Sequence, residues 1–141
     1  MWVVHQSDHS SAAFAFPRRW KECSPRVRTC PKTGSIVLWP ELQNDKYKPL
    51  AVDSQNIKTK KEHEGWNAVM NPDEKGGEGY VVFKIDAPKP LTKITQGARM
   101  YVRNPKSEIR FEHSFDGGST WTRSFSFTDT EQPWDDIHNQ V

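Results

Sequence analysis

The fold of this chain is constrained most strongly by short stretches in which apolar and polar residues alternate, with turn-forming residues between them. In residues 80–86, Val81, Phe83 and Ile85 alternate with the intervening residues, which places them on one face of an extended strand. Comparable stretches follow at 91–96, 98–104, 108–114 and 121–128. Turn signals recur about every ten residues without a helical period, so the sequence predicts an antiparallel all-β fold, a sandwich or barrel.

In two of these stretches the alternation predicts which side chains share one face of the strand. In residues 108–114, His113 shares one face with Ile109 and Phe111, so it is expected to be a hydrogen-bonded histidine of the core and not a base. The stretch 121–128 is expected to place four residues on one face, namely Trp121, Arg123, Phe125 and Phe127.

The first part of the chain has a different pattern. Its apolar stretches are short, and they are interrupted by Pro17, Pro25, Pro31 and Gly34. Because proline is poorly tolerated in central strands, we expect an extended arm or an edge strand over residues 1–34. A length of 141 residues fits one domain. The prediction is therefore an N-terminal arm at 1–34 and a β-sandwich at 35–141, which ends in an acidic tail.

Composition limits the possible partners. The mean hydropathy is -0.85 and no run of 18 apolar residues occurs, so the sequence predicts no membrane-spanning helix. The net charge of +2 gives no strong field for nucleic acid, although basic residues gather in residues 1–35 and acidic ones in 129–141. These two ends are either solvated or paired with each other. Nucleic acid is a runner-up partner that no binding-fold signature accompanies.

The two cysteines leave the cellular compartment open. Cys23 and Cys30 are close enough in sequence for a disulfide, which would imply an oxidising compartment, but two free thiols fit equally well. They form neither a four-ligand zinc site nor a CxxC pair. The first residues lack the pattern of a signal peptide. Either the protein stays in the cell, or the sequence is part of a secreted protein.

Residues 114–121 read Ser-Phe-Asp-Gly-Gly-Ser-Thr-Trp and match S-x-D-x-G-x-T-W at its fixed positions, which are Ser114, Asp116, Gly118, Thr120 and Trp121. The segment resembles the Asp-box of sialidase propellers, reelin repeats and other extracellular β-domains. Asp116 is expected to accept hydrogen bonds from backbone N–H groups of its own turn, and the glycines permit positive φ. Trp121 is expected to fold beneath the turn into the core. Because this hairpin occurs in unrelated folds, it predicts the local structure of the turn and not an activity.

A wider stretch, residues 79–128, resembles the second half of galactose-binding-like jelly-roll domains. The resemblance runs from GYVVFKIDAPKPLTKITQGARMYVRN into SEIRFEHSFDGGSTWTRSFSF and covers about a third of the chain. Such domains occur as carbohydrate-binding modules, discoidin domains and accessory domains of polysaccharide-degrading enzymes. The resemblance therefore implies a jelly-roll sandwich with a sugar-binding or accessory role.

The sequence contains no recognisable catalytic pattern. A nucleophile elbow, a phosphate-binding loop, a dinucleotide fingerprint and an HExxH motif are all missing from it. His63 with Glu62 and Glu64 lies in a lysine-rich segment typical of a solvated loop or edge. Asp135 and Asp136 point apart on an extended chain, which is poor geometry for a glycosidase pair. We therefore predict no catalytic residues, no metal ligands and no cofactor.

Features that suit binding are better represented. Trp39, Trp66 and Tyr80 lie at strand or loop margins, and Arg103 lies near a turn. A half-exposed ring suits the apolar face of a sugar, and arginine suits a hydroxyl or a carboxylate. We therefore expect a non-catalytic module that binds carbohydrate, acidic polysaccharide included, through these four residues. The alternative is a structural or protein-interaction domain without a small-molecule ligand, in which the tryptophan rings fill the core.

Overall fold

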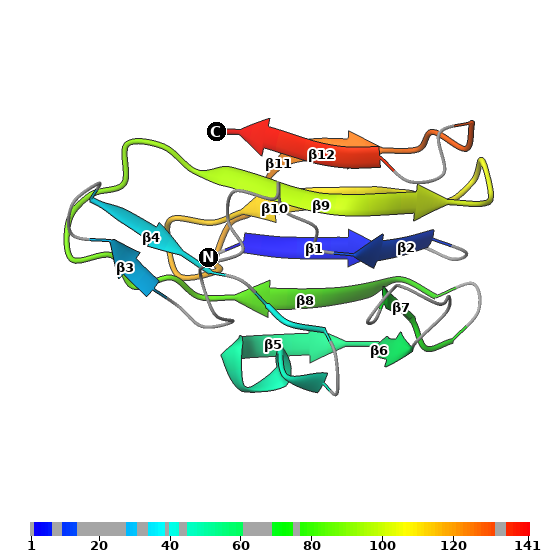
Figure 1. Ribbon diagram of the computed structural model, residues 1–141, viewed down its shortest axis with the longest axis horizontal. Helices are drawn as coiled ribbons and strands as arrows, with labels where there is room; N and C mark the ends of the chain where they lie inside the picture. The colour runs from blue at the N-terminus through cyan, green and yellow to red at the C-terminus, as the bar shows by residue number, and fades with distance from the viewer. Residues whose placement is uncertain are drawn as a thin grey trace.

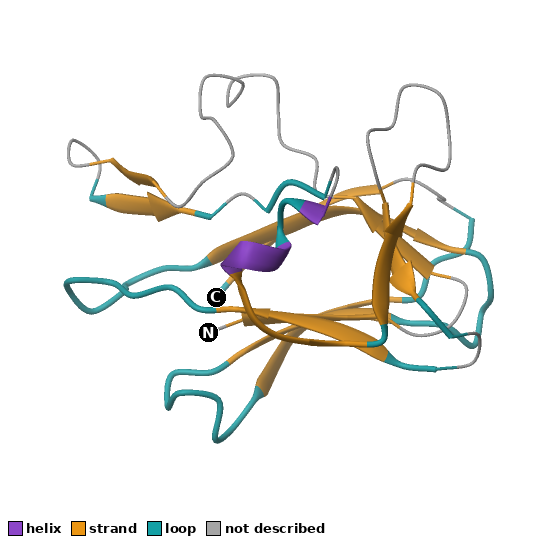
Figure 2. Ribbon diagram, turned by 90° about the horizontal axis from the view of Figure 1, so that it is seen from below, coloured by secondary structure: helices purple, strands orange, loops and turns teal. Residues whose placement is uncertain are grey.

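The computed structural model describes residues 2–6, 10–13, 28–30, 34–38, 40–42, 45–60, 69–74, 77–131 and 135–141. Within these ranges the regular structure consists of strands and of short 3-10 segments, which include η3 (Lys48–Leu50) and are purple in Figure 2. All paired strands run antiparallel. The fold is therefore all-β, as the alternation predicts. None of these residues belongs to a helix with the length and apolar character needed to cross a membrane.

Most strands belong to two five-stranded sheets (Figure 1). The first sheet contains, in order, β11 (Thr122–Phe127), β10 (Ile109–His113), β1 (Trp2–Gln6), β8 (Gly79–Phe83) and β5 (Ala51–Gln55). The second sheet contains, in order, β12 (Asp135–Gln140), β9 (Thr95–Val102), β2 (Ser10–Ala13), β7 (Val69–Pro72) and β6 (Ile57–Lys60). A separate two-stranded sheet pairs β3 (Arg28–Cys30) with β4 (Ser35–Val37).

Strands that follow one another along the chain alternate between the two large sheets. The pairs β1/β2, β5/β6, β7/β8, β9/β10 and β11/β12 each have one member in each sheet. The two members also hold the same position in the strand order. The chain therefore crosses from one sheet to the other at matching positions, and each sheet is assembled from residues far apart in sequence.

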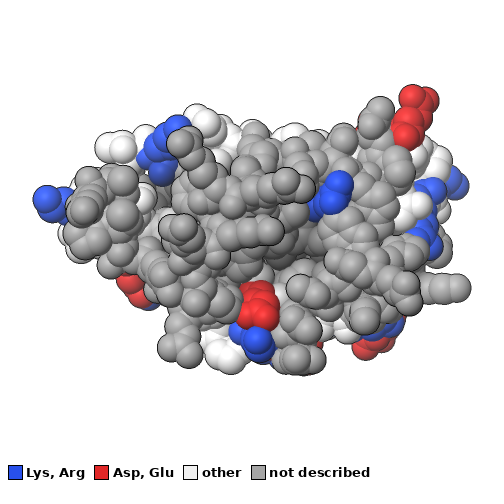
Figure 3. Space-filling model, in the orientation of Figure 1, with Lys and Arg blue, Asp and Glu red and all other residues white. Residues whose placement is uncertain are grey.

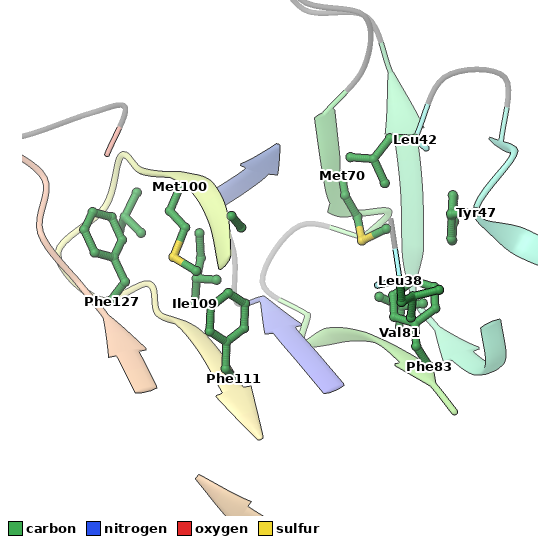
Figure 4. Packing of buried hydrophobic residues seen from close by; sticks show 12 residues of the cluster. Leu38, Leu42, Tyr47, Met70, Val81, Phe83, Met100, Ile109, Phe111 and Phe127 are labelled. Atoms are coloured by element: carbon green, nitrogen blue, oxygen red, sulfur yellow. The ribbon is translucent and has the colours of Figure 1, made fainter. Parts of the chain in front are cut away.

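Both sheets contribute to one buried hydrophobic cluster (Figure 4). Its members are Leu38, Leu42, Tyr47, Met70, Val81, Phe83, Ala98, Met100, Val102, Ile109, Phe111 and Phe127. On β8, β9 and β10 these are alternate residues, so each strand turns one face inward. In Figure 4 the labelled side chains form two groups, one beside β9 and β10 and one beside β7 and β8, with β1 and β2 between them.

The expectation of an arm or edge strand in residues 1–34 is wrong for residues 2–6 and 10–13. Strand β1 pairs with β10 on one side and β8 on the other, and β2 lies between β9 and β7. The prolines behind that expectation occur at positions 17, 25 and 31, after both strands. The restriction that proline places on central strands therefore does not apply to residues 2–13.

Three strands lie in segments whose sequence predicts polar loops or a tail. Strands β5 and β6 come from the lysine-rich region, and β12 comes from the acidic C-terminal segment. All three are outermost strands of their sheets. An outermost strand needs backbone pairing on one side only and can keep polar side chains in water. Its sequence therefore need not show the apolar alternation that predicts a strand.

Asn56 directs the chain from β5 in the first sheet to β6 in the second. Its φ angle of 49° is in the left-handed region, which asparagine tolerates better than most residues. Its side chain donates to the carbonyl of Glu78 at 3.1 Å and accepts the N–H of Glu74 at 2.9 Å. A Cβ on Gly79 would collide with the Asn56 carbonyl oxygen and lie 2.7 Å from Ile57 Cδ1, so only glycine fits there.

Candidate binding site

An open cleft of about 470 Å³ lies between two loops at one end of the molecule. Its lining residues are Ala87, Pro88, Lys89, Pro90, Leu91 and Phe115. The first five belong to the connection from β8 to β9, and Phe115 belongs to the turn from β10 to β11. Figure 1 shows both connections at its left. The cleft is therefore built from loops that the two sheets hold in position.

Phe115 is the most exposed large apolar residue of the cleft. Its exposed fraction is 74%, and its ring meets the ring of His113 edge-on, with centroids 5.1 Å apart. His113 is buried on β10, as its place beside Ile109 and Phe111 predicts, although its Nδ1 has no hydrogen-bond partner among the described residues. The aromatic contact, worth roughly 0.5–1.5 kcal/mol in such pairs, anchors a ring that is otherwise in water.

Hydrogen bonds within the turn from Ser114 to Trp121 fix the backbone that carries Phe115. The Ser114 hydroxyl donates to Asp116 Oδ1 at 2.7 Å and accepts the N–H of Gly118 at 2.9 Å. Asp116 also accepts the N–H of Thr120 at 2.9 Å and its hydroxyl at 2.6 Å. Gly117 and Gly118 have φ of 77° and 95°, which glycine adopts without strain. This is the local hydrogen bonding that the sequence predicts for Asp116.

The bonds from Thr120, followed by that from Ser114, hold the pKa of the Asp116 carboxyl well below its usual range. Donors that bind the ionised form stabilise it relative to the protonated acid. The oxygens of Asp116 are thus engaged by its own turn, and the residue has a structural role.

The expectation that Trp121 enters the core is wrong, because its exposed fraction is 37%. The pairing of β10 with β11 contains a register shift, in which Phe111 lies opposite Phe125 but Glu112 lies opposite Arg123. Ser124 is the extra residue of this β-bulge, and the alternation reverses beyond it. Phe125 therefore faces the core, whereas Arg123 and Trp121, two residues apart, belong to the opposite face.

Of the four residues that the sequence suggests for sugar binding, the structure describes Tyr80 and Arg103. Trp39 and Trp66 lie outside the described residues. The Tyr80 hydroxyl donates to Asp53 Oδ2 at 3.0 Å, and this bond raises the pKa of Tyr80. Arg103 follows β9 in the second sheet, with its guanidinium 4.9 Å from the ring centroid of Tyr101. Tyr80 and Arg103 stand on different sheets, and neither lines the cleft.

The cleft residues were missed because each has an ordinary structural explanation in the sequence. Pro88, Lys89 and Pro90 form a turn signal, and Phe115 fills a variable position of the Ser114–Trp121 pattern. One signal was available. A phenylalanine between Ser114 and Asp116, at the tip of a polar turn, has no strand face through which to enter the core.

The outward face of the first sheet holds a cluster of charged side chains, which are Glu78, Glu108, Arg110, Glu112 and Arg123. Arg110 contacts Glu78 and lies 3.4 Å from Glu108 and 3.2 Å from Glu112. A hydrogen bond from Ser126 is the main cause of a lowered pKa at Glu108, and both arginines add to it. Each carboxylate of the cluster has a cationic partner, so the arrangement favours support of the sheet over acid–base chemistry.

Among the described residues, the other charged side chains give no further site. Glu62, His63 and Glu64 lie outside the described residues, and of Asp135 and Asp136 only the backbone is described. Within the described part of the chain, no three His, Cys, Asp or Glu side chains lie close enough to hold a metal ion. On the face in Figure 3 the described charges of both signs are scattered, with no large patch of one sign. No protein-family model, curated protein or solved structure matches this chain.

Proposed function

We propose that this protein is a non-catalytic carbohydrate-binding module on a jelly-roll β-sandwich of galactose-binding-like type, with an Asp-box hairpin beside its binding site. The strand order supports the architecture. Successive strands alternate between two antiparallel sheets at matching positions, an arrangement that fits a double-sheet jelly roll. The shared buried cluster fits two sheets that pack face to face.

The single observation that carries the function is the cleft beside the exposed ring of Phe115. Its volume of about 470 Å³ is in the range of small-ligand sites. A pyranose ring has an apolar C–H face, which packs against an aromatic ring, and a polar rim that stays in contact with water. Because hydrogen bonds already fix the turn that carries Phe115, binding orders little of the protein.

We expect weak binding to a single site, with a Kd of about micromolar to millimolar, because a shallow cleft buries little area. The module should also be inert toward the polysaccharides it binds. Incubation with neutral and acidic polysaccharides should release no new reducing ends.

The test compares Phe115→Ala with wild type in affinity electrophoresis through a panel of soluble polysaccharides. Phe115→Ala should lower affinity for the retarding polymer about ten-fold, equivalent to roughly 1.4 kcal/mol. It should lower the melting temperature by only a few degrees, because the ring is 74% exposed and loses only its contact with His113. Val52→Ala is the matched control, since Val52 is an exposed apolar residue on β5 outside the cleft. Unchanged retardation of Phe115→Ala, or no retardation of wild type by any polymer, would refute the proposal.

A protein-interaction module is the second candidate, and a specific observation favours it. Leu91 and Phe115, which both line the cleft, have exposed fractions of 46% and 74%, and Trp121, in the same turn segment as Phe115, has an exposed fraction of 37%. Apolar residues that are exposed side by side mark contact surfaces. A stable protein complex buries about 1,200–2,000 Å² in total, far more than one cleft. If this candidate is correct, substitution of Trp121 and Leu91 should weaken partner capture as much as Phe115→Ala does.

A further inference from the structure

The geometry points to a sugar ring that carries a carboxylate or a sulfate as the ligand of the cleft, with Lys89 as the side chain that recognises the charge. This inference rests on the proposed carbohydrate-binding function and names its ligand class.

The first step concerns the chemistry of the lining. Among its six residues only Lys89 has a side chain that forms hydrogen bonds, since the others are alanine, two prolines, leucine and phenylalanine. Lysine is a donor and always brings its positive charge to the contact at neutral pH. Any hydrogen bond from these side chains to a ligand therefore comes from the cationic ammonium group of Lys89.

The second step is that Lys89 is available for a ligand. Lys46, Lys48, Lys58 and Lys84 each have a carboxylate partner between 2.7 and 2.9 Å away. Lys89 is exposed and has no such partner among the described residues. Proline on both sides limits its backbone freedom, since each ring fixes its own φ and restricts the residue before it.

The third step concerns the two carboxylates that are next to lining residues in the sequence, Asp86 beside Ala87 and Asp116 beside Phe115. Asp86 lies 2.9 Å from the ammonium group of Lys84. The carboxylate of Asp116 is occupied by donors from its own turn. Asp116 still carries its charge beside Phe115, so an anionic ligand should place its acid group toward Lys89 and its apolar face on the ring. The two sides of the cleft thereby define one orientation of the sugar.

An acidic peptide fits this surface less well than an acidic sugar. Peptides that bind as added strands need backbone N–H and C=O groups along an exposed edge. Pro88 and Pro90 supply no N–H groups to this cleft. A single ring against Phe115 with one charge toward Lys89 needs no such edge.

The experiment uses Lys89→Gln, which keeps a polar side chain and removes the charge. Lys93→Gln is the matched control, because Lys93 is an exposed lysine of the same connection that does not line the cleft. Isothermal titration compares polygalacturonate with its methyl ester, and dextran sulfate with dextran. Wild type should prefer the charged member of at least one pair about two- to five-fold, the range of an exposed ion pair. Lys89→Gln and high salt should remove that preference, and Lys93→Gln should keep it.

The outcomes separate this inference from the function on which it rests. Equal binding of charged and neutral polymers in both pairs overturns the inference and leaves carbohydrate binding intact. Polyglutamate that binds as tightly as the acidic sugars, with no effect of Phe115→Ala, also overturns it, because charge alone would then suffice. Failure of wild type to bind any polysaccharide removes the proposed function, and the inference with it.

Discussion

The carboxylate of Asp116 accepts three hydrogen bonds from Ser114 and Thr120, although the side chain is at the surface. In the unfolded chain Asp116 has no such donors, and its pKa is near the ordinary value of 3.8. Because its pKa is lower in the folded protein, ionisation of Asp116 favours the folded state. The group therefore stabilises the fold fully above the unfolded pKa. That contribution decreases as pH falls through 3.8 toward the lower pKa of the folded state.

Asp116→Asn should consequently lower the free energy of unfolding at pH 6 by more than it does at pH 3. Urea unfolding followed by tryptophan fluorescence measures both differences. Asp86→Asn is the control, because Asp86 forms an ion pair with Lys84 on the surface, and should have little effect at either pH. A destabilisation by Asp116→Asn that is equal at both pH values would show that the charge does not hold the turn.

Single residues also show where sequence reasoning succeeds and where it fails. The bonds of Asp116 were predictable because they lie within four residues of it. The exposure of Trp121 was not, because it depends on a bulge that appears only when β11 pairs with β10. The cleft beside Phe115 was not predictable either, since the loop that faces this residue is far away in sequence.

Among the elements, β11 has a connecting role through its bulge. The Ser124 hydroxyl donates to Gln96 Oε1 on β9 at 2.6 Å, and the Asn139 amide on β12 donates to the Ser124 carbonyl at 3.1 Å. These bonds join an outermost strand of the first sheet to the second sheet. Gln96 is buried, with 3% exposed, and its Nε2 has no partner among the described residues. Ser124 thus supplies a bond that water would have difficulty replacing.

Ser124→Ala should destabilise the protein by about 1–3 kcal/mol, the usual penalty for a buried polar group that loses its partner. Equilibrium urea unfolding provides the measurement. Ser126→Ala serves as the control, because the Ser126 hydroxyl bonds to Glu108 at the surface, where water can take its place. If the two variants lose the same stability, the link between the sheets contributes nothing beyond an ordinary surface bond.

The strands that alternation located best are those with one buried face. Residues 80–86 and 108–114 contain β8 and β10 almost as predicted. The extended region expected around Gly97 contains β9, which runs from Thr95 to Val102 and in which Gly97 pairs with His138. Strand β5 has exposed side chains from Val52 to Gln55 and so lacks the apolar signal.

At the scale of the whole molecule, β1 and β2 occupy the centre of their sheets. Sequence could not show this, because it depends on long-range pairing with β10, β8, β9 and β7 and not on local pattern. Without these two strands each sheet would be divided into two separate pairs of strands. The N-terminal segment therefore supplies the central strand of both sheets, although the polar and proline-rich sequence around it does not indicate this.

Removal of residues 1–13 should abolish cooperative unfolding, since it deletes the central strand of both sheets. The expected result is a chain without dispersed amide resonances in NMR spectra and without a thermal transition in circular dichroism. Addition of a synthetic peptide of residues 1–13 should restore part of the signal. A shortened chain that melts cooperatively near the temperature of the full chain would contradict the central placement of β1 and β2.

The early position of β1 and β2 in the chain has a consequence during synthesis on the ribosome. These strands leave the exit tunnel before the strands with which they pair, and β10, which completes the pairing of β1, ends only at His113. At a translation rate of about 5–20 residues per second, an interval on the order of 5–20 s passes before that partner is available. Throughout it, at least one edge of β1 lacks its partner strand and offers unpaired backbone groups to other chains. Newly made protein is therefore most exposed to aggregation before about the last fifth of these 141 residues has been translated.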